Sequence, residues 1–219
     1  MNPNLRRLIA AAVPLVAIAA MVGLRAQDSG PQPTCKMCPG TYVPNEEIQA
    51  YVKRAIANDL TDQQVRNVDI GKSNVAVAVV HRKRINDPNA VVAEHDLVSE
   101  VYHVISGSAT LVLGPDLVGM ERRPANLTTV RLLNGPGNNA KAIRNGVAHQ
   151  IKAGDVVFIP AGTGHQFTRI DDHVTYLMIR IDPDKVTPVK TEADSKADLQ
   201  TDGRNTAGGG RGAATDPRR

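Results

Sequence analysis

Two short stretches of the chain place imidazole and carboxylate groups at spacings that suit metal coordination. The first, AEHDLVSEVYHVISG, holds His95 and Glu100 with four residues between them, and the second, GDVVFIPAGTGHQF, holds His165. Two imidazoles and one carboxylate suffice for a divalent Fe, Mn, Ni, Cu or Zn ion and leave positions open to water and substrate. A substrate bound at an open position is polarised there. The sequence therefore predicts a metal site at His95, Glu100 and His165.

These residues lie in short β-branched runs that turn residues separate. Such runs recur over about residues 73–181, among them SNVAVAVVHR, SEVYHVISG and HVTYLMIRI. Their spacing predicts an all-β sandwich or barrel. In the second stretch Gly154 permits a tight turn into a strand, and Gly162 tolerates unusual backbone angles. Pro160 has no backbone N–H to donate to a neighbouring strand, so the strand is expected to end there. His165 then begins the next strand, and we expect it to face inwards.

The second stretch resembles the second cupin motif, G-x5-P-x-G-x2-H-x3-N. The residues that fit it are Gly154, Pro160, Gly162 and His165. Arg169 replaces the final asparagine. A guanidinium beside a metal would attract an anionic substrate. An ion pair between Arg169 and a carboxylate on a neighbouring strand is the alternative.

The first stretch resembles the first cupin motif, G-x5-H-x-H-x3,4-E-x6-G, in part. His95, Glu100 and Gly107 fit it, whereas Ala93 replaces the first histidine and Asp87 the first glycine. Glu94 or Asp96 could replace the missing ligand, but strand alternation points both away from His95. Ala93 also leaves open a barrel that binds a small ligand without metal.

Over about residues 70–182 the chain resembles the single-domain bacterial cupins, which implies their double-stranded β-helix, or jelly roll, and a possible homodimer. Alternation along the strands predicts which neighbours share the cavity. His103 is expected to point outwards. The side chains expected to contact substrate are Tyr102, Phe167, Arg169 and His149.

The N-terminal sequence predicts export to the periplasm or beyond. Residues 1–26 have paired arginines, an apolar run and a small residue before polar sequence, as in a secretory signal peptide. An uncleaved membrane anchor is the alternative. The formal charge is +4, and the three arginines of this leader reduce it to +1 when removed. No basic stripe with interleaved aromatic residues supports nucleic-acid binding.

Residues 27–44 are rich in Pro, Gly and Ser and are interpreted as a linker. It contains Cys35 and Cys38 in CKMCPGTY. In an exported protein this pair could be a disulfide, a redox pair or half of a metal site. No second CxxC or suitably spaced histidine completes a zinc site, so a structural disulfide or two idle thiols is favoured.

The remaining segments flank or interrupt the barrel. Residues 45–69 predict an extension with an amphipathic helix in NEEIQAYVKRAIAND. The barrel is expected at 70–183, with a long loop between Gly114 and Gly146 that holds one strand at Thr128–Leu133 and covers the mouth. Residues 184–219 have few large apolar residues and are predicted to be a disordered tail.

The function expected from these features is that of a metal-dependent enzyme, of dioxygenase or isomerase type, acting on a small and perhaps anionic organic molecule. A metal-free module that binds a small ligand is the second hypothesis, and a purely structural role in the envelope is the third. Fold alone does not choose among them.

Overall fold

A computed structural model of the chain describes residues 30–208. Contacts divide the chain into two units, Met1–Pro33 and Thr34–Arg219, and every described helix and strand belongs to the second. The predicted signal peptide, 1–26, and residues 209–219 lie outside the described residues. Within residues 30–208, no helix combines the length and the apolar character that crossing a membrane requires.

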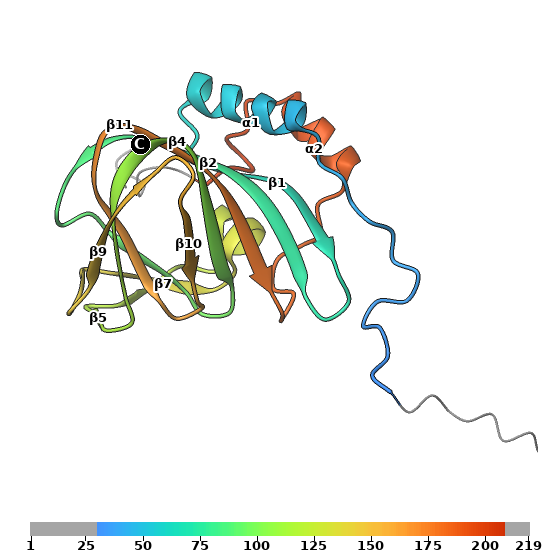
Figure 1. Cartoon of the computed structure of the whole chain (residues 1–219), viewed down its shortest axis with the longest axis horizontal. Helices are drawn as coiled ribbons and strands as arrows, with labels where there is room; N and C mark the ends of the chain where they lie inside the picture. The colour runs from blue at the N-terminus through green and yellow to red at the C-terminus, as the bar shows by residue number, and fades with distance from the viewer. Residues whose placement is uncertain (1–29, 209–219) are drawn as a thin grey trace, which may run out of the picture. The chain divides into compact units, whose positions relative to one another are not determined.

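The second unit is built mainly from antiparallel strands (Figure 1). The strands are β1 (Asp62–Asp69), β2 (Asn74–Asn86), β3 (Val92–His95), β4 (Ser99–Gly114), β5 (Leu117–Val118), β6 (Glu121–Arg122), β7 (Gly137–Ala140), β8 (Ala142–Ile143), β9 (Val147–Lys152), β10 (Val156–Ile159) and β11 (Gly164–Asp182). The helices are α1 (Asn45–Asn58), the π-helix η1 (Thr129–Asn134) and α2 (Glu192–Leu199).

One nine-stranded sheet carries the fold, in the order β1-β2-β11-β3-β7-β6, with β4 pairing with β9, β10 and β11. A small second sheet pairs β5 with β8. The long strand β11 pairs with β2, β3 and β4, so it joins the elements that carry His95, Glu100 and His165. The all-β prediction is confirmed, and the pairing of β11 is what positions the site.

The interior is apolar and includes a group of stacked aromatic rings. The centroid of the Tyr176 ring lies 4.4 Å from that of Tyr102 and 5.9 Å from that of Phe167. All three side chains are buried. Each contributes about 1.5–3 kcal/mol of burial free energy. This packing fixes the inward faces of β4 and β11 next to the site.

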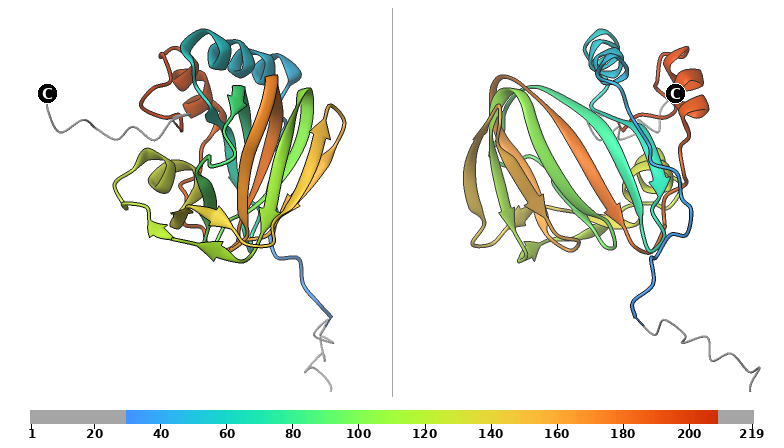
Figure 2. Two further views of the ribbon diagram at one scale, coloured as in Figure 1. Left: turned by 90° about the vertical axis from the view of Figure 1, so that its left-hand side faces the viewer. Right: turned by 45° about the vertical axis from the view of Figure 1, so that its right-hand side comes forward.

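Helix α1 forms where the sequence predicts it. Ile48 and Tyr51 are buried on its inner face, where they pack with Val65 of β1 and Val79 of β2. Figures 1 and 2 show α1 lying over these strands with α2 beside it. The rest of the predicted helical extension differs, because residues 62–69 form β1, which pairs with β2 and extends the sheet.

The C-terminal prediction needs correction. Residues 184–208 pack against α1 and β1, and α2 begins with a capping box between Thr191 and Asp194. Asp198 binds Arg54 of α1 at 3.0 Å and Lys190 at 2.6 Å. This segment is held largely by buried polar contacts, so a criterion based on apolar residues fails to predict its structure.

Two further segments have defined structure. The predicted strand at Thr128–Leu133 is wrong, because Thr129–Asn134 forms η1, with Val130 and Leu133 buried. The surrounding segment also contains β5 to β8. In the predicted linker, Cys35 and Cys38 form a disulfide with their Cα atoms 5.7 Å apart.

Candidate metal site in the barrel

Three side chains from three strands meet inside the barrel. His95 ends β3, Glu100 lies near the start of β4 and His165 is the second residue of β11. His95 Nε2 is 3.2 Å from Glu100 Oε1, and His165 Nε2 is 3.7 Å from Glu100 Oε2. One donor atom from each residue lies within 4.8 Å of the others, and all three residues are buried. The predicted grouping is therefore present.

The turn between β10 and β11 brings His165 to the site. Gly154 and Gly162 have φ of 93° and 79°, left-handed values that glycine adopts without steric cost. Gly162 N donates to the His95 carbonyl oxygen at 2.8 Å and ties this turn to β3. His165 then pairs in register with Ala93. Ala93 thus stands opposite His165, where the motif would have a further histidine.

Glu100 lies at the centre of the group and is only partly hydrogen-bonded. Tyr102 Oη donates to Glu100 Oε2 at 2.7 Å. Glu100 Oε1 accepts no well-aligned hydrogen bond within residues 30–208, although His95 Nε2 and Arg180 Nε lie 3.2 and 3.6 Å away. Burial alone would raise the pKa of Glu100, but His95, His165 and Arg180 together hold it well below its usual range. The carboxylate is therefore ionised at neutral pH.

His165 is neutral and oriented as a metal ligand. Burial lowers the pKa of His165 to about 4, although the neighbouring Glu100 carboxylate acts to raise it. His165 Nδ1 lies 3.3 Å from the Thr163 carbonyl oxygen, which can only accept, so Nδ1 carries the proton. The lone pair is left on Nε2, on the side of Glu100. Metal-binding histidines characteristically have such an acceptor at the other ring nitrogen.

These observations fit a bound cation. An ionised carboxylate with one oxygen that accepts no hydrogen bond among residues 30–208, and a neutral imidazole with its lone pair directed inwards, are suitable donors for a transition metal. His95 is the third residue of the donor group. Because Ala93 cannot ligate, the protein provides a three-residue donor set rather than four.

Two of the side chains predicted to contact substrate lie inward beside the site. Tyr102 contacts Glu100 directly, and the Phe167 ring stacks on Tyr102 with centroids 6.4 Å apart. Phe167 belongs to the apolar core. His103, between these inward positions of β4, is exposed as expected.

Arg169 was predicted wrongly to face the cavity. Its side chain is exposed and pairs with Asp171 at 2.8 Å. A β-bulge between Phe167 and Arg169 shifts the register of β11 against β4, so simple alternation from His165 fails there. The alternative of an ion pair is closer to the structure, although the partner lies on the same strand.

His149 is also exposed and is not one of the grouped donors. It lies on β9, which pairs only with β4 among the described strands. Alternation predicts its face correctly, since its neighbour Ile151 is buried. His149 stays exposed because β9 is an edge strand, where an inward-facing side chain is not always covered. The sequence gives no sign that β9 is at an edge.

Glu94 and Asp96 point away from the group, as expected. Glu94 accepts from Asn138 Nδ2 at 2.7 Å, and Asp96 pairs with Arg122. Neither therefore replaces the missing ligand at Ala93.

Three arginines near the site were not identified from the sequence. Arg180 of β11 is buried and pairs with Asp62, Arg82 lies 4.7 Å from the Phe167 ring centroid, and Arg123 contacts His95. Alternation from Tyr176 on β11 could have indicated Arg180. No comparable signal exists for Arg123, which follows the two-residue strand β6.

Comparison with known proteins supports this architecture. The family model of the AraC-like ligand binding domain matches residues 142–206, a segment that contains His165. The matched segment contains the second of the two partial motifs, and the barrel brings His95 and Glu100 of the first motif beside it. The chain is a cupin-superfamily protein. No curated protein matches it at a significant level.

Several solved structures are similar to this cupin. A Bacillus halodurans protein is 17% identical over 74% of this chain and 98% of its own, with a TM-score of 0.38. A cupin 2 conserved barrel domain protein from Salinispora arenicola is 18% identical over 56% and 76%, with a TM-score of 0.31. The DMSP lyase DddQ from Ruegeria pomeroyi is 18% identical over 59% of this chain and 49% of its own, with a TM-score of 0.35. These likenesses carry no functional argument.

Proposed function

We propose that this cupin binds one divalent transition metal through His95, Glu100 and His165 and acts on a small organic molecule at that ion. The observation that carries the proposal is the meeting of three buried donors around Glu100, whose Oε1 has no hydrogen-bond partner among residues 30–208. A buried unpaired carboxylate oxygen is costly unless a cation or a donor group satisfies it.

The surrounding residues hold these donors in place. Burial first, and then the charge of Glu100, raise the pKa of Tyr102 well above its usual value. The Tyr102 hydroxyl therefore stays protonated and donates to Glu100 Oε2. The Thr163 carbonyl oxygen fixes the tautomer of His165. A bound metal would supply Lewis-acid polarisation of a substrate oxygen and, if redox-active, access to oxygen chemistry.

The reaction is proposed to be of dioxygenase or isomerase type, with a small, anionic substrate. Support for an anion comes from the buried guanidinium of Arg180, whose Nε and Nη1 have no hydrogen-bond partner within the described part of the chain. Arg180 Nε lies 3.6 Å from Glu100 Oε1, whereas the exposed Arg169 pairs with Asp171. A guanidinium with free donors suits a carboxylate.

Metal analysis of the purified protein, followed by separate titrations with Mn²⁺, Fe²⁺, Ni²⁺, Cu²⁺ and Zn²⁺, tests the proposal. We expect about one ion per chain in the wild type and a loss of affinity of at least about 100-fold in His165→Ala. His149→Ala is the matched control, because it removes an exposed histidine outside the group. Absence of metal binding in the wild type would contradict the proposal.

A metal-free module that binds a small ligand is the second function, and one observation favours it. Ala93, paired with His165, removes one ligand that the motif would supply. The family matched at residues 142–206 is described as ligand-binding. Thermal shifts with small carboxylates or sugars separate the two functions, because stabilisation that is unchanged by a chelator would support the metal-free module.

We also propose that the protein is exported, on the basis of the leader-like residues 1–26. The disulfide between Cys35 and Cys38 is consistent with an oxidising compartment. The N-terminal sequence of the protein recovered from its native cells tests this proposal, and an intact N-terminus on a protein in the reducing cytoplasm would contradict it.

A further inference from the structure

One of the two site histidines is contacted by an arginine. Arg123 Nη2 lies 2.9 Å from His95 Nδ1 and also donates to the Glu94 carbonyl oxygen. A guanidinium has N–H donors and no acceptor, so His95 Nδ1 must accept this hydrogen bond. When Nδ1 accepts in this way, a ring with a single proton carries it on Nε2, the nitrogen that lies 3.2 Å from Glu100 Oε1.

The two histidines of the site thus have opposite tautomers. At His165 a carbonyl oxygen faces Nδ1, which leaves the lone pair on Nε2. At His95 a donor faces Nδ1, which places the lone pair away from Glu100. A neutral imidazole cannot present a lone pair to Arg123 and to a metal beside Glu100 at the same time.

The fold makes room for this contact. Gly137 of β7 pairs with His95, and Arg123 N donates to the Gly137 carbonyl oxygen at 3.1 Å. A Cβ atom at position 137 would overlap Arg123 Nη2 and the Glu94 carbonyl oxygen. The guanidinium is not saturated, since its buried Nε has no hydrogen-bond partner among the described residues. Arg123 is therefore directed at His95 and Glu94 by the backbone around Gly137.

We propose that Arg123 is a positioning residue that opposes metal binding, by holding His95 in the tautomer that cannot ligate. This inference rests on the proposed metal-binding function of the same site. Metal binds through all three residues only when Arg123 leaves His95 Nδ1, so the affinity of the wild-type protein for metal is weaker than its donor set alone would give.

Titration of the full-length protein with Zn²⁺ and, separately, with Ni²⁺ tests this role. We expect Arg123→Met, which lacks the donor, to bind either ion about tenfold or more tightly than the wild type, the effect expected from losing a charge-assisted hydrogen bond. Arg122→Met is the matched control. It removes the same charge from the adjacent residue, whose side chain is exposed and pairs with Asp96. Equal affinities of Arg123→Met and the wild type would overturn the proposal, as would an equal gain in Arg122→Met.

A second measurement depends neither on metal nor on the fold of a variant. The ¹⁵N shifts of the histidine rings in the metal-free wild-type protein report which nitrogen carries the proton. We expect His95 to be protonated on Nε2 and His165 on Nδ1, and a proton on His95 Nδ1 would overturn the role of Arg123. If neither the wild type nor Arg123→Met bound metal, both the proposed function and this inference would fail, whereas equal binding by the two proteins would remove only the inference.

Discussion

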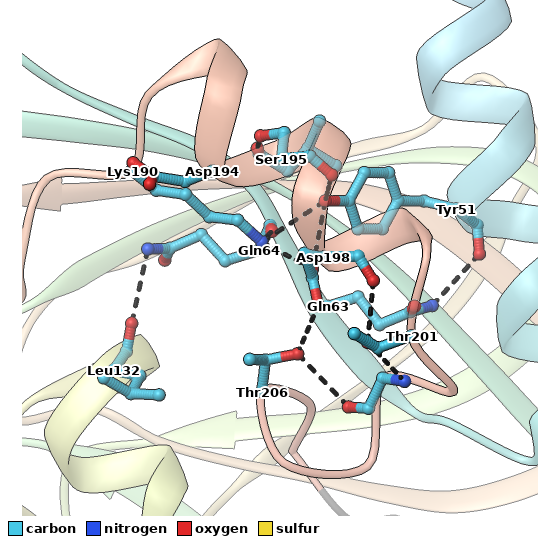
Figure 3. Close-up of polar contacts among 12 residues, drawn as sticks. Tyr51, Gln63, Gln64, Leu132, Lys190, Asp194, Ser195, Asp198, Thr201 and Thr206 are labelled. Carbon is cyan, nitrogen blue, oxygen red and sulfur yellow. Dashed lines mark hydrogen bonds and ion pairs between the residues drawn. The ribbon is translucent and has the colours of Figure 1, made fainter.

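Two regions of this cupin bury a carboxylate among cationic groups, and they satisfy it differently. Asp198 of the C-terminal segment accepts hydrogen bonds at both oxygens, including one from Arg54 Nη2 at 3.0 Å. Figure 3 shows Lys190, whose Nζ donates to the same carboxylate at 2.6 Å. Glu100 in the barrel accepts one from Tyr102, while its other oxygen has no such partner among residues 30–208.

The difference indicates which group is structural and which is available for binding. Lys190 uses its three donors on Tyr51, Gln64 and Asp198, so its ammonium group has none left for a ligand. A buried group that the protein leaves unsatisfied calls for an explanation, and a bound cation provides one for Glu100. We therefore assign a stabilising role to Asp198 and a binding role to Glu100.

Removal of the saturated carboxylate should have the largest effect on stability. We expect Asp198→Ala to lower the free energy of unfolding by about 3 kcal/mol, because Arg54 and Lys190 would lose a buried partner. Urea denaturation followed by circular dichroism measures this loss. Lys196→Ala, which breaks only an exposed pair with Glu192, should change stability by less than about 0.5 kcal/mol. Equal losses in the two variants would refute the structural role of Asp198.

The same carboxylate predicts a dependence of stability on pH. Burial alone would raise the pKa of Asp198, but hydrogen bonds from Arg54, Lys190 and Thr206 hold it well below its usual range. A lowered pKa in the folded state stabilises the fold above the unfolded value of about 3.9, and this contribution is lost as the pH falls below it. The difference in unfolding free energy between wild type and Asp198→Asn should therefore shrink on acidification below about pH 4. A difference that stayed constant down to pH 2 would contradict the assignment.

In the barrel, Tyr102→Phe removes the one hydrogen bond that holds Glu100. We expect a loss of stability of about 1.5 kcal/mol and metal binding weaker by about tenfold. Calorimetric titration and thermal unfolding measure the two effects. Tyr176→Phe removes another buried hydroxyl, one that Arg82 contacts, and should leave metal affinity unchanged. If Tyr102→Phe bound metal as tightly as the wild type, the Tyr102 hydroxyl would have no role in metal binding.

Ala93→His offers a way to complete the donor set. Since position 93 pairs with His165, a fourth ligand there should strengthen metal binding on the order of tenfold. Val147→His on the exposed edge strand β9 serves as the control and should have no effect. If Ala93→His bound metal no more tightly than the wild type, or if Val147→His gained as much affinity, position 93 would not face the donors.

The smallest effect is expected at Arg169. Because its side chain is exposed and pairs only with Asp171 in the contacts found, Arg169→Ala should change the unfolding free energy by less than about 0.5 kcal/mol. Ligand-induced thermal shifts should equal those of the wild type. A lost ligand response would support the predicted role of Arg169 in substrate binding, despite its exposed position.

The grouping of His95, Glu100 and His165 could be predicted because the motifs that contain them are local in sequence. His95 and Glu100 lie in one short stretch, and His165 follows a glycine turn whose positive φ values the sequence requires. The error at Arg169 arose from a bulge, which interrupts strand alternation without a clear residue signal.

Other features depend on contacts between distant segments. Composition indicated disorder after residue 184, yet Asp198 and Lys190 anchor this segment to α1 and β1. Arg123 reaches His95 only because β7 pairs with β3 and Gly137 leaves space. Pairing of this kind cannot be read from a single stretch of sequence.

Calorimetric titration of Zn²⁺ and Ni²⁺ into three proteins, the wild type, Glu100→Gln and Asp198→Asn, tests the central claim most directly. The account predicts about one site per chain in the wild type and in Asp198→Asn, and binding weakened by at least about 100-fold in Glu100→Gln. Circular dichroism confirms that each protein is folded. Wild-type protein that binds neither ion, or Glu100→Gln that binds as tightly as the wild type, would contradict the claim that Glu100 is the centre of a metal site.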